Sequence, residues 1–233
     1  MRRKPSRAVF AVLLVVLSLL ASQSGAEEVN KLDLKLRRAT MVLDQFMLSP
    51  DQQAPRDLVN GAYAVAIFPG VYKGAIVIGA QYGSGVTCVF DSESRQWSAP
   101  AFFEIGGGSL GLQLGGQSMD VVLVIMNERG MNAILKGIGT IGAEASVAAD
   151  PVGRDATART DLTLKADIYS YSRASGLFAG VSLGGAIIAP DEPANEEFYG
   201  EPITARQILT QKKVEPKGEA LPLIEALKKF SGK

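Results

Sequence analysis

Residues 107–117, GGSLGLQLGGQ, and residues 176–185, GLFAGVSLGG, place glycines four positions apart within apolar sequence. Residues two or four positions apart share a face of a β-strand. In each stretch, one face of the strand would carry small residues and the opposite face would carry leucines. Glycine inside a strand marks a sharp bend or a close approach between backbones. The two stretches therefore predict a strongly curved, glycine-rich antiparallel sheet, either barrel-like or a sandwich.

Apolar, β-branched and aromatic runs separated by Gly, Pro and Asp predict further strands. These runs cover residues 62–70, 74–83, 85–91, 95–106, 118–127, 143–150, 162–173 and 176–190. Helical patterns flank and interrupt them, with Thr204 as an N-cap, at residues 28–48, 55–60, 127–137, 203–213 and 220–230. An N-terminal amphipathic helix and C-terminal helices around many closely spaced strands indicate a single α+β domain.

The first helix, residues 28–48, has an apolar stripe with basic residues beside it. The stripe recurs every three or four positions and consists of Val29, Leu32, Leu36, Ala39, Leu43 and Phe46. Two arrangements fit this pattern. The stripe packs on the protein's own core, or it lies at the acyl boundary of a membrane while basic residues contact lipid phosphates. Such residues contribute about 1 kcal/mol each near a strongly anionic surface, which supports reversible attachment.

The first 26 residues have the pattern of a secretory signal peptide. Four basic residues accompany a 14-residue apolar run, Ala8–Ala21, and Ser24-Gly25-Ala26 place small residues before Glu27. The run is shorter than the roughly 20 residues of a membrane span. The pattern predicts cleavage after residue 26, one domain over residues 27–233, and a secreted or periplasmic location with possible peripheral attachment to an envelope membrane.

Charge and composition exclude several classes of function. Four of the 24 basic residues and none of the 24 acidic residues lie before residue 27, so residues 27–233 carry a formal net charge of −4, which does not indicate a nucleic-acid binder. The chain contains no histidine, the commonest general base and metal ligand. Its single cysteine, Cys88, cannot form an internal disulfide. We expect no enzyme activity, no cofactor and no bound metal.

Three kinds of motif, one of which occurs twice, favour structural interpretations. Two G-x-S-x-G matches centre on Ser109 and Ser182, but no helical pattern follows either serine and no histidine is present to activate it. GIGTIG at residues 137–142 follows a helical stretch rather than a strand, so it fits a helix that ends at glycine better than a dinucleotide site. The acidic run DEPANEE, residues 191–197, lacks EF-hand spacing and fits a solvated turn.

Five long motifs resemble the SYLF domain family, in the family's order, within a match from about residue 28 to residue 212. They are AIFPGVYKGAIVIGAQYGSGV, FEIGGGSLGLQLGGQSMDVVLVIMN, GAEASVAADPVGR, IYSYSRASGLFAGVSLGGAII and FYGEPITARQIL. Eukaryotic members of that family accompany SH3 or FYVE modules and are associated with phosphoinositide-containing membranes and, in yeast, with actin. The resemblance implies lipid binding by a basic N-terminal helix, in a stand-alone bacterial secreted member. Export would separate such a protein from cytoplasmic actin, so actin is not an expected partner.

We therefore expect an exported, non-enzymatic domain that binds anionic phospholipid headgroups reversibly. The predicted phosphate contacts on the first helix are Lys31, Lys35, Arg37 and Arg38. Three further cations join them because they fall inside the matching motifs: Lys73, Arg154 and Arg173. Three alternatives stay open. The first is an envelope protein-interaction module with helix 28–48 docked in its core, and the second is a carrier that encloses an apolar ligand within the curved sheet. The third is an enzyme that uses Ser109, Ser182, Tyr169 or Tyr171.

Overall fold

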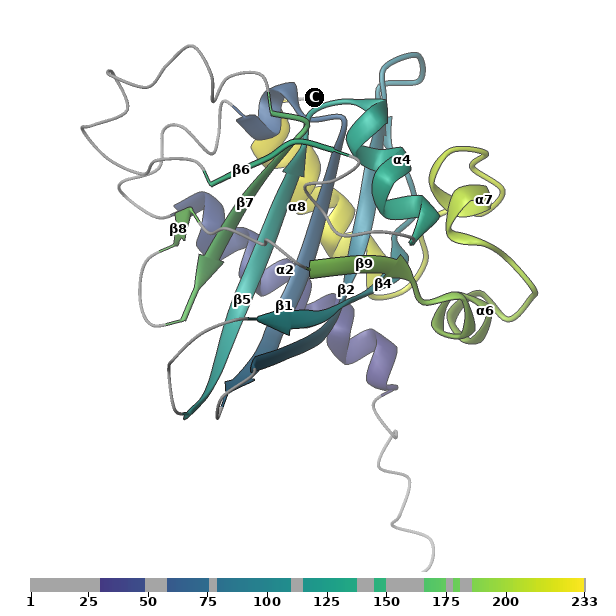
Figure 1. Ribbon diagram of the computed structural model, residues 1–233. Helices are drawn as coiled ribbons and strands as arrows, with labels where there is room; N and C mark the ends of the chain where they lie inside the picture. The colour runs from purple at the N-terminus through teal and green to yellow at the C-terminus, as the bar shows by residue number, and fades with distance from the viewer. Residues whose placement is uncertain are drawn as a thin grey trace, which may run out of the picture. The chain divides into compact units, whose positions relative to one another are not determined.

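The computed structural model describes residues 30–48, 58–75, 79–109, 115–137, 145–149, 166–174, 178–180 and 186–232. Residues Lys31–Lys233 form one compact unit, in which a β-sheet lies between layers of helices (Figure 1). The helices are α2 (Lys31–Leu48), α4 (Glu128–Lys136), α6 (Glu192–Tyr199), α7 (Ala205–Leu209) and α8 (Ala220–Ser231).

The sheet is mainly antiparallel and open. Its strands are β1 (Ala64–Ala75), β2 (Gly79–Asp91), β3 (Gln96–Trp97), β4 (Ala101–Ser109), β5 (Gly115–Ile125), β6 (Val147–Ala149), β7 (Ile168–Arg173), β8 (Ala179–Gly180) and β9 (Ala186–Pro190). Their order is β6-β7-β5-β1-β2-β4-β9, with β3 paired to β2 and β8 to β7. Among the described strands, only β6 and β7 run parallel. The mixed helix-and-strand class is confirmed, but the described strands do not close into a barrel.

Burial on both faces explains why the sequence shows continuous apolar runs rather than alternation. On β1, Val65 and Ile67 belong to one hydrophobic core, whereas Ala66 and Phe68 belong to the other. Strand β5 repeats this pattern with the buried segment 121–125. Strands covered on both faces read as unbroken hydrophobic segments.

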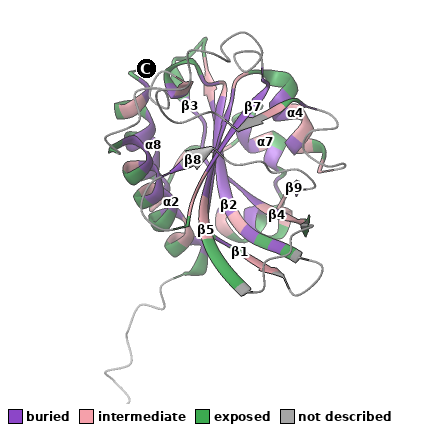
Figure 2. Cartoon of the chain, turned by 60° about the vertical axis from the view of Figure 1, so that its left-hand side comes forward, coloured by how far each residue is buried: buried purple, intermediate pink, exposed green. Residues whose placement is uncertain are grey.

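Helices cover both faces of the sheet. Leu36 of α2 and Leu223 of α8 share a core with one face of the sheet, and the two helices pack against each other. Ile134 of α4 and Ile208 of α7 belong to the core on the other face. Figure 2 shows the two pairs of helices on opposite sides of the strands. The central strands are therefore enclosed, whereas the outer surface of each helix faces solvent.

The glycine-rich stretch 107–117 belongs to two strands, not to the one that its periodicity predicts. Strand β4 ends at Ser109 and β5 begins at Gly115, and two other strands lie between them in the sheet. The chain changes strand inside the stretch, which a period-two pattern cannot reveal. Close backbone approach is nevertheless observed at Gly85 of β2, where a Cβ atom would lie 2.1 Å from the carbonyl oxygen of Ile67.

The companion stretch 176–185 is described only at residues 178–180, of which Ala179–Gly180 form β8. Ser182 lies outside the described residues, and Ser109 is the last residue of β4.

Helix termini decide the predicted N-cap and two of the motif interpretations. Thr204 caps α7 in a reciprocal capping box with Gln207, which confirms the predicted N-cap. Helix α4 ends at Gly137 with φ of 61°, so GIGTIG does begin at a helix C-cap. The run 191–197 is not the turn that we expected. Asp191 caps α6 and a proline occupies its first turn, and both features favour the start of a helix.

Candidate functional site

The apolar stripe of α2 lies in the protein core. Leu36, Leu43 and Phe46 are fully buried, and the Phe46 ring centroid lies 5.0 Å from that of Tyr171 and 5.1 Å from that of Phe178. Of the two arrangements that the sequence left open, the stripe therefore packs in the core, and its placement at the acyl boundary of a membrane is wrong. The reason is tertiary packing, because the stripe covers an apolar face of the sheet that would otherwise be exposed to water.

The opposite side of α2 carries a second apolar line that the periodicity analysis missed. Leu34, Met41 and Leu48 are 39%, 59% and 62% exposed. A seven-residue spacing rotates each side chain about 20° from the previous one, so the three follow one side of the helix. Lys31 and Arg38 are exposed beside this line. The spacing is visible in the sequence, but the longer buried stripe obscured it.

This surface combines apolar and cationic side chains without a carboxylate. We call it the outward face of α2, and it consists of Lys31, Leu34, Arg38, Met41, Gln45 and Leu48. Lys31 and Arg38 form no salt bridge with any residue that the structure describes. Their charges are therefore available to an anionic ligand.

The other two predicted cations of α2 have partners inside the protein. The Arg37 guanidinium donates a hydrogen bond of 2.8 Å to Glu219 and so links α2 to the start of α8. The Lys35 ammonium lies 5.5 Å from the centre of the Phe102 ring. Burial lowers the pKa of Lys35, and nearby carboxylates, Asp191 foremost, oppose that shift. Both side chains contribute to the packing of α2 rather than to its outward face.

The three cations predicted from the motifs are dispersed. Arg173 lies at the end of β7, close to α2. Lys73 follows Val71 by two positions on β1, and Val71 belongs to the core on the α4 side, so Lys73 faces away from α2. Arg154 lies outside the described residues. The structure therefore brings Arg173, but not Lys73, to the side of the sheet that α2 occupies.

A pocket of about 290 Å³ opens beside the outward face, between α2 and the sheet. We call it the α2 pocket. Its lining residues come from α2, β1, β5 and β7, and they are Arg38, Met41, Val42, Gln45, Pro69, Gly70, Asp120 and Arg173. Arg38, Met41 and Gln45 belong to both the pocket and the outward face, so the two surfaces are continuous.

Asp120 organises the sheet wall of the α2 pocket. One carboxylate oxygen accepts a hydrogen bond of 3.0 Å from the Gly70 N–H, and the other accepts one of 2.7 Å from the Arg173 guanidinium. Gly70, with φ of 65°, lies where β1 changes register with its neighbours. The Arg173 guanidinium also lies 4.9 Å from the centre of the Phe178 ring. These contacts hold Arg173 in place at the pocket.

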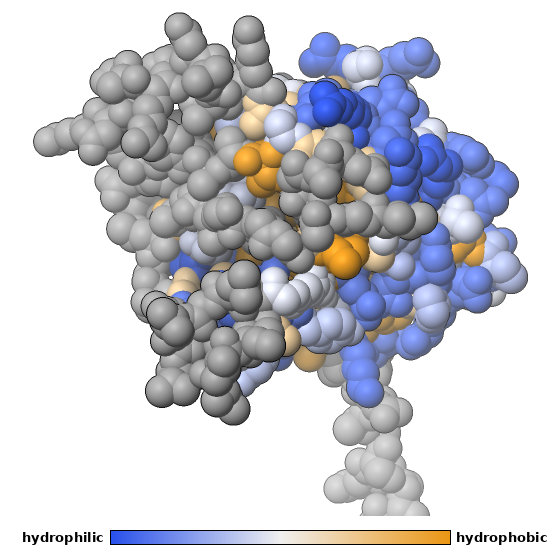
Figure 3. All heavy atoms as spheres, viewed as in Figure 1, coloured by the Kyte–Doolittle hydropathy of each residue, from blue (hydrophilic) through white to orange (hydrophobic). Residues whose placement is uncertain are grey.

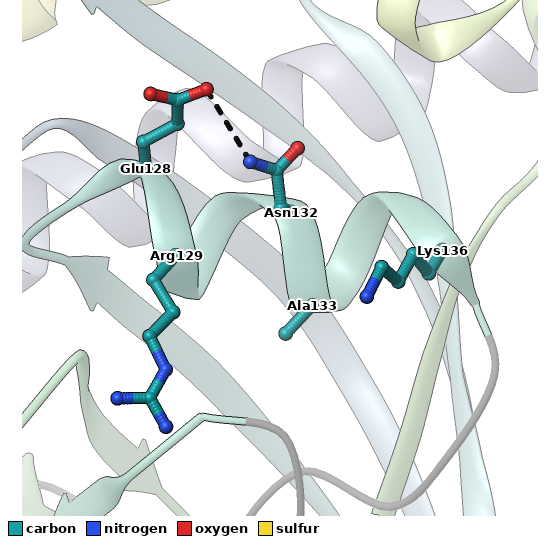
Figure 4. Close-up of a pocket in the computed structure, with 5 residues that line it drawn as sticks. All are labelled: Glu128, Arg129, Asn132, Ala133 and Lys136. Atoms are coloured by element: carbon teal, nitrogen blue, oxygen red, sulfur yellow. Dashed lines mark hydrogen bonds between the residues drawn. The ribbon is translucent and has the colours of Figure 1, made fainter.

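A second hollow of about 510 Å³ lies on α4, on the other side of the sheet. Its described lining residues all come from this one helix, and Figure 4 shows Arg129 and Lys136 extending on either side of Ala133. Glu128 accepts a hydrogen bond of 3.4 Å from the Asn132 side chain. The described surface around α4, α6 and α7 is mostly hydrophilic (Figure 3). None of the predicted site residues that the structure describes lines this hollow, so the α2 pocket is the better candidate.

Two titratable groups outside the pockets, Glu192 and Cys88, have structural positions. Glu192 accepts hydrogen bonds from the Asn195 side chain, at 3.2 Å, and from the Ala205 N–H, at 2.9 Å, so it ties α6 to α7. Cys88 is buried, and burial raises the pKa of its thiol. Among the described residues there is no cluster of three or more side chains suited to a metal ion. None of the described helices combines the length and apolar character needed to cross a bilayer.

A cationic and partly apolar helix face that continues into a pocket with apolar walls and a few polar groups is suited to binding a ligand or a partner. The chain belongs to the Ysc84 family, described as Las17-binding protein actin regulators, whose family model matches residues 106–230. This is the SYLF family that the sequence motifs indicated. The family description names binding and regulation rather than a reaction.

Curated relatives include eukaryotic proteins longer than the matched region. The chain is 32% identical over 204 residues to SH3 domain-containing YSC84-like protein 1 of Xenopus laevis, covering 84% of this chain and 60% of that protein. It is 30% identical over 210 residues to the Homo sapiens protein of the same name, covering 88% and 60%. LAS seventeen-binding protein 3 of Saccharomyces cerevisiae is 31% identical over 192 residues, with 81% of this chain and 41% of that protein covered.

Proposed function

We propose that this chain is a non-catalytic binding domain that attaches reversibly to anionic phospholipid membranes through the outward face of α2. The observation that carries the proposal is the exposed line of Leu34, Met41 and Leu48 with Lys31 and Arg38 beside it. An interfacial helix needs apolar side chains for the acyl boundary and cations for the phosphates. The outward face supplies both while the buried stripe keeps α2 in the core.

The expected strength of this attachment is modest. Lys31 and Arg38 contribute about 1 kcal/mol each near an anionic surface. Full burial of a Leu or Met side chain contributes about 1.5–3 kcal/mol, and the three apolar side chains are only partly exposed, so about 1 kcal/mol each is reasonable. The total of about 5 kcal/mol is similar to the contribution of a single acyl chain, which binds membranes reversibly.

The family description favours a second candidate, a protein-interaction module. One relative is named for binding LAS seventeen, and the family is described as an actin regulator. The packing of α2 in the core also agrees with this hypothesis, which expects the helix to be docked. A protein partner would use the same exposed side chains, so vesicles without any added protein distinguish the two candidates.

Vesicle flotation of the purified chain tests the membrane proposal. We expect binding to vesicles that contain phosphatidylglycerol, weaker binding at high salt, and little binding to purely zwitterionic vesicles. Charge reversal in Lys31→Glu with Arg38→Glu should abolish flotation. The matched control reverses two exposed cations outside α2, Arg206→Glu with Lys213→Glu, and should retain it. Flotation that persists after the first pair of substitutions, or is lost equally with both, would refute the assignment.

We also propose that the protein is exported, so that the membrane it meets belongs to a cell envelope. The signal-peptide pattern of residues 1–26 supports this location. Intact mass measurement of the protein from an extracytoplasmic fraction should give a chain that begins at Glu27. A full-length chain in the cytoplasmic fraction would contradict export without affecting the binding proposal.

A further inference from the structure

Two exposed tyrosines lie opposite each other on the sheet, outside the α2 pocket and the hollow on α4. Tyr72 of β1 and Tyr82 of β2 are partners in the antiparallel register, and each is 58% exposed. Val71 belongs to the core on the α4 side, so its neighbour Tyr72 projects from the side of the sheet that α2 occupies. Figure 1 shows the ends of β1 and β5 extending beyond α2. The helix therefore leaves this part of the sheet face open to solvent.

The register extends this pair of tyrosines into a row across the sheet. Tyr72 is opposite Ser118 of β5, and Tyr82 is opposite Gly106 of β4. Gly106 is in turn opposite Ile187 of β9, which is also exposed. We call Ser118, Tyr72, Tyr82, Gly106 and Ile187 the tyrosine row. Neighbouring strands lie about 4.8 Å apart, so the row spans roughly 19 Å, enough for a ligand with several linked rings.

Two glycines allow the Tyr72 ring to lie flat on the sheet. Gly74 and Gly116 are cross-strand partners, two residues along from Tyr72 and Ser118. A Cβ atom on Gly116 would lie 2.4 Å from the Tyr72 hydroxyl oxygen, and a Cβ atom on Gly74 would lie 3.1 Å from a ring carbon of Tyr72. The phenol end of Tyr72 therefore occupies the space that two side chains would otherwise fill, and one face of its ring is turned to solvent.

A hydrogen bond orients the second tyrosine. The Tyr82 hydroxyl donates to Glu104 of β4 at 2.6 Å. This bond raises the pKa of Tyr82, so the hydroxyl stays protonated as the donor. A carboxylate accepts hydrogen bonds at both oxygens, so Glu104 has further acceptor capacity beside the ring. Neither the tyrosine row nor Glu104 contributes a cation, and these groups therefore suit a ligand with many hydroxyls and no negative charge.

We propose that the tyrosine row binds a neutral glycan, a chain of β-1,4-linked pyranose rings. The C–H groups on the flat side of a pyranose pack against aromatic rings, whose faces are electron-rich. The hydroxyls at the edge of the sugar hydrogen-bond to groups such as Glu104 and Ser118. A proline-rich peptide suits this surface less, because such peptides dock in aromatic-lined grooves and neither tyrosine lines either pocket described above. The inference does not depend on membrane attachment.

Calorimetric titration of the purified chain with cellohexaose tests this assignment. We expect Tyr72→Ala and Tyr82→Ala each to weaken binding about five- to tenfold, the size of one lost aromatic contact. Gly116→Ala keeps both tyrosines but places a methyl group where the Tyr72 hydroxyl lies. The flexible end of that side chain must move, so binding should weaken several-fold while thermal stability is retained. Gly61→Ala, before β1, is the matched control, because its Cβ would meet its nearest neighbour at 3.4 Å, an ordinary contact, and it should leave affinity unchanged.

Three outcomes overturn the glycan assignment. The first is no binding of cellohexaose at millimolar concentration, or equal affinity in the parent chain and in the tyrosine and Gly116 variants. The second is binding of a decaproline peptide in place of the glycan, with the same sensitivity to the tyrosine substitutions, which would make the row a peptide site. The third comes from flotation with phosphatidylglycerol vesicles. The double variant Tyr72→Ala with Tyr82→Ala should float as the parent chain does, and loss of its flotation would assign the row to membrane contact instead.

Discussion

Replacement of Phe46 by alanine tests whether the stripe of α2 is structural. Phe46 is fully buried and contacts the rings of Tyr171 and Phe178. Truncation of a buried Phe to Ala costs about 3–5 kcal/mol, from lost apolar burial and the cavity that remains. A domain of this size loses about 2–4 °C in melting temperature per kcal/mol, so the expected decrease is roughly 6–20 °C. If the stripe instead left the core to meet a membrane, Phe46→Ala would leave the stability of the free protein almost unchanged.

Thermal and urea unfolding of the soluble chain measure this effect without lipid. Met41→Ala is the matched control, because Met41 lies on the same helix but is 59% exposed. Surface substitutions of this kind change stability by less than about 0.5 kcal/mol. The reasoning is refuted if Phe46→Ala and Met41→Ala have equal effects, or if Phe46→Ala lowers the free energy of unfolding by less than about 1 kcal/mol.

Three further predictions follow from individual contacts. Cys88 is buried and its thiol pKa is raised, so a thiol reagent should modify it only after unfolding, and rapid labelling of the native protein would contradict its placement. Thr204→Ala removes the N-cap of α7 and should lower the free energy of unfolding by about 1 kcal/mol in a denaturant titration. An unchanged free energy of unfolding would contradict the role of this cap. Burial acts to raise the pKa of Asp167, but hydrogen bonds from Ser146 and Asn127 outweigh it and lower that pKa. Its contribution to stability is therefore present above the ordinary carboxyl pKa of about 3.9 and is lost as pH falls through the lowered value. Asp167→Asn should flatten the stability profile over that acidic range, and an unchanged slope would count against this assignment.

Local chemistry made part of the fold predictable from the sequence. The N-cap at Thr204 and the C-cap at Gly137 follow from side-chain type and position, and both are observed. The apolar run 118–127 predicted a strand, and it corresponds to most of β5. The run 191–197 forms a helix instead of the expected turn, because an aspartate cap and a proline in the first turn favour a helix start. Strand order, the open sheet and the division of residues 107–117 between two strands depend on distant pairings that local periodicity does not encode.

The candidate site was less predictable for the same reason. The helix 28–48 and its basic residues were recognisable, but an amphipathic pattern does not specify whether its apolar side meets a sheet or a bilayer. Only packing against Tyr171 and Phe178 decides that question. Arg38 and Arg173 were both predicted as anion contacts, yet their meeting at one pocket depends on the position of α2 across the sheet. The roles of Arg37 and Lys35 likewise depend on partners that are remote in sequence.

Fluorescence of an environment-sensitive label on the outward face tests the central claim most directly. Met41→Cys carries the label on α2, and Gln211→Cys carries it at an exposed control position beyond α7, while the buried Cys88 stays unlabelled. When anionic vesicles are added, we expect a blue shift and higher intensity at position 41, no change at position 211, and unchanged circular dichroism. No shift at position 41, equal shifts at both positions, or a shift that requires loss of folded structure would contradict membrane attachment by a docked helix.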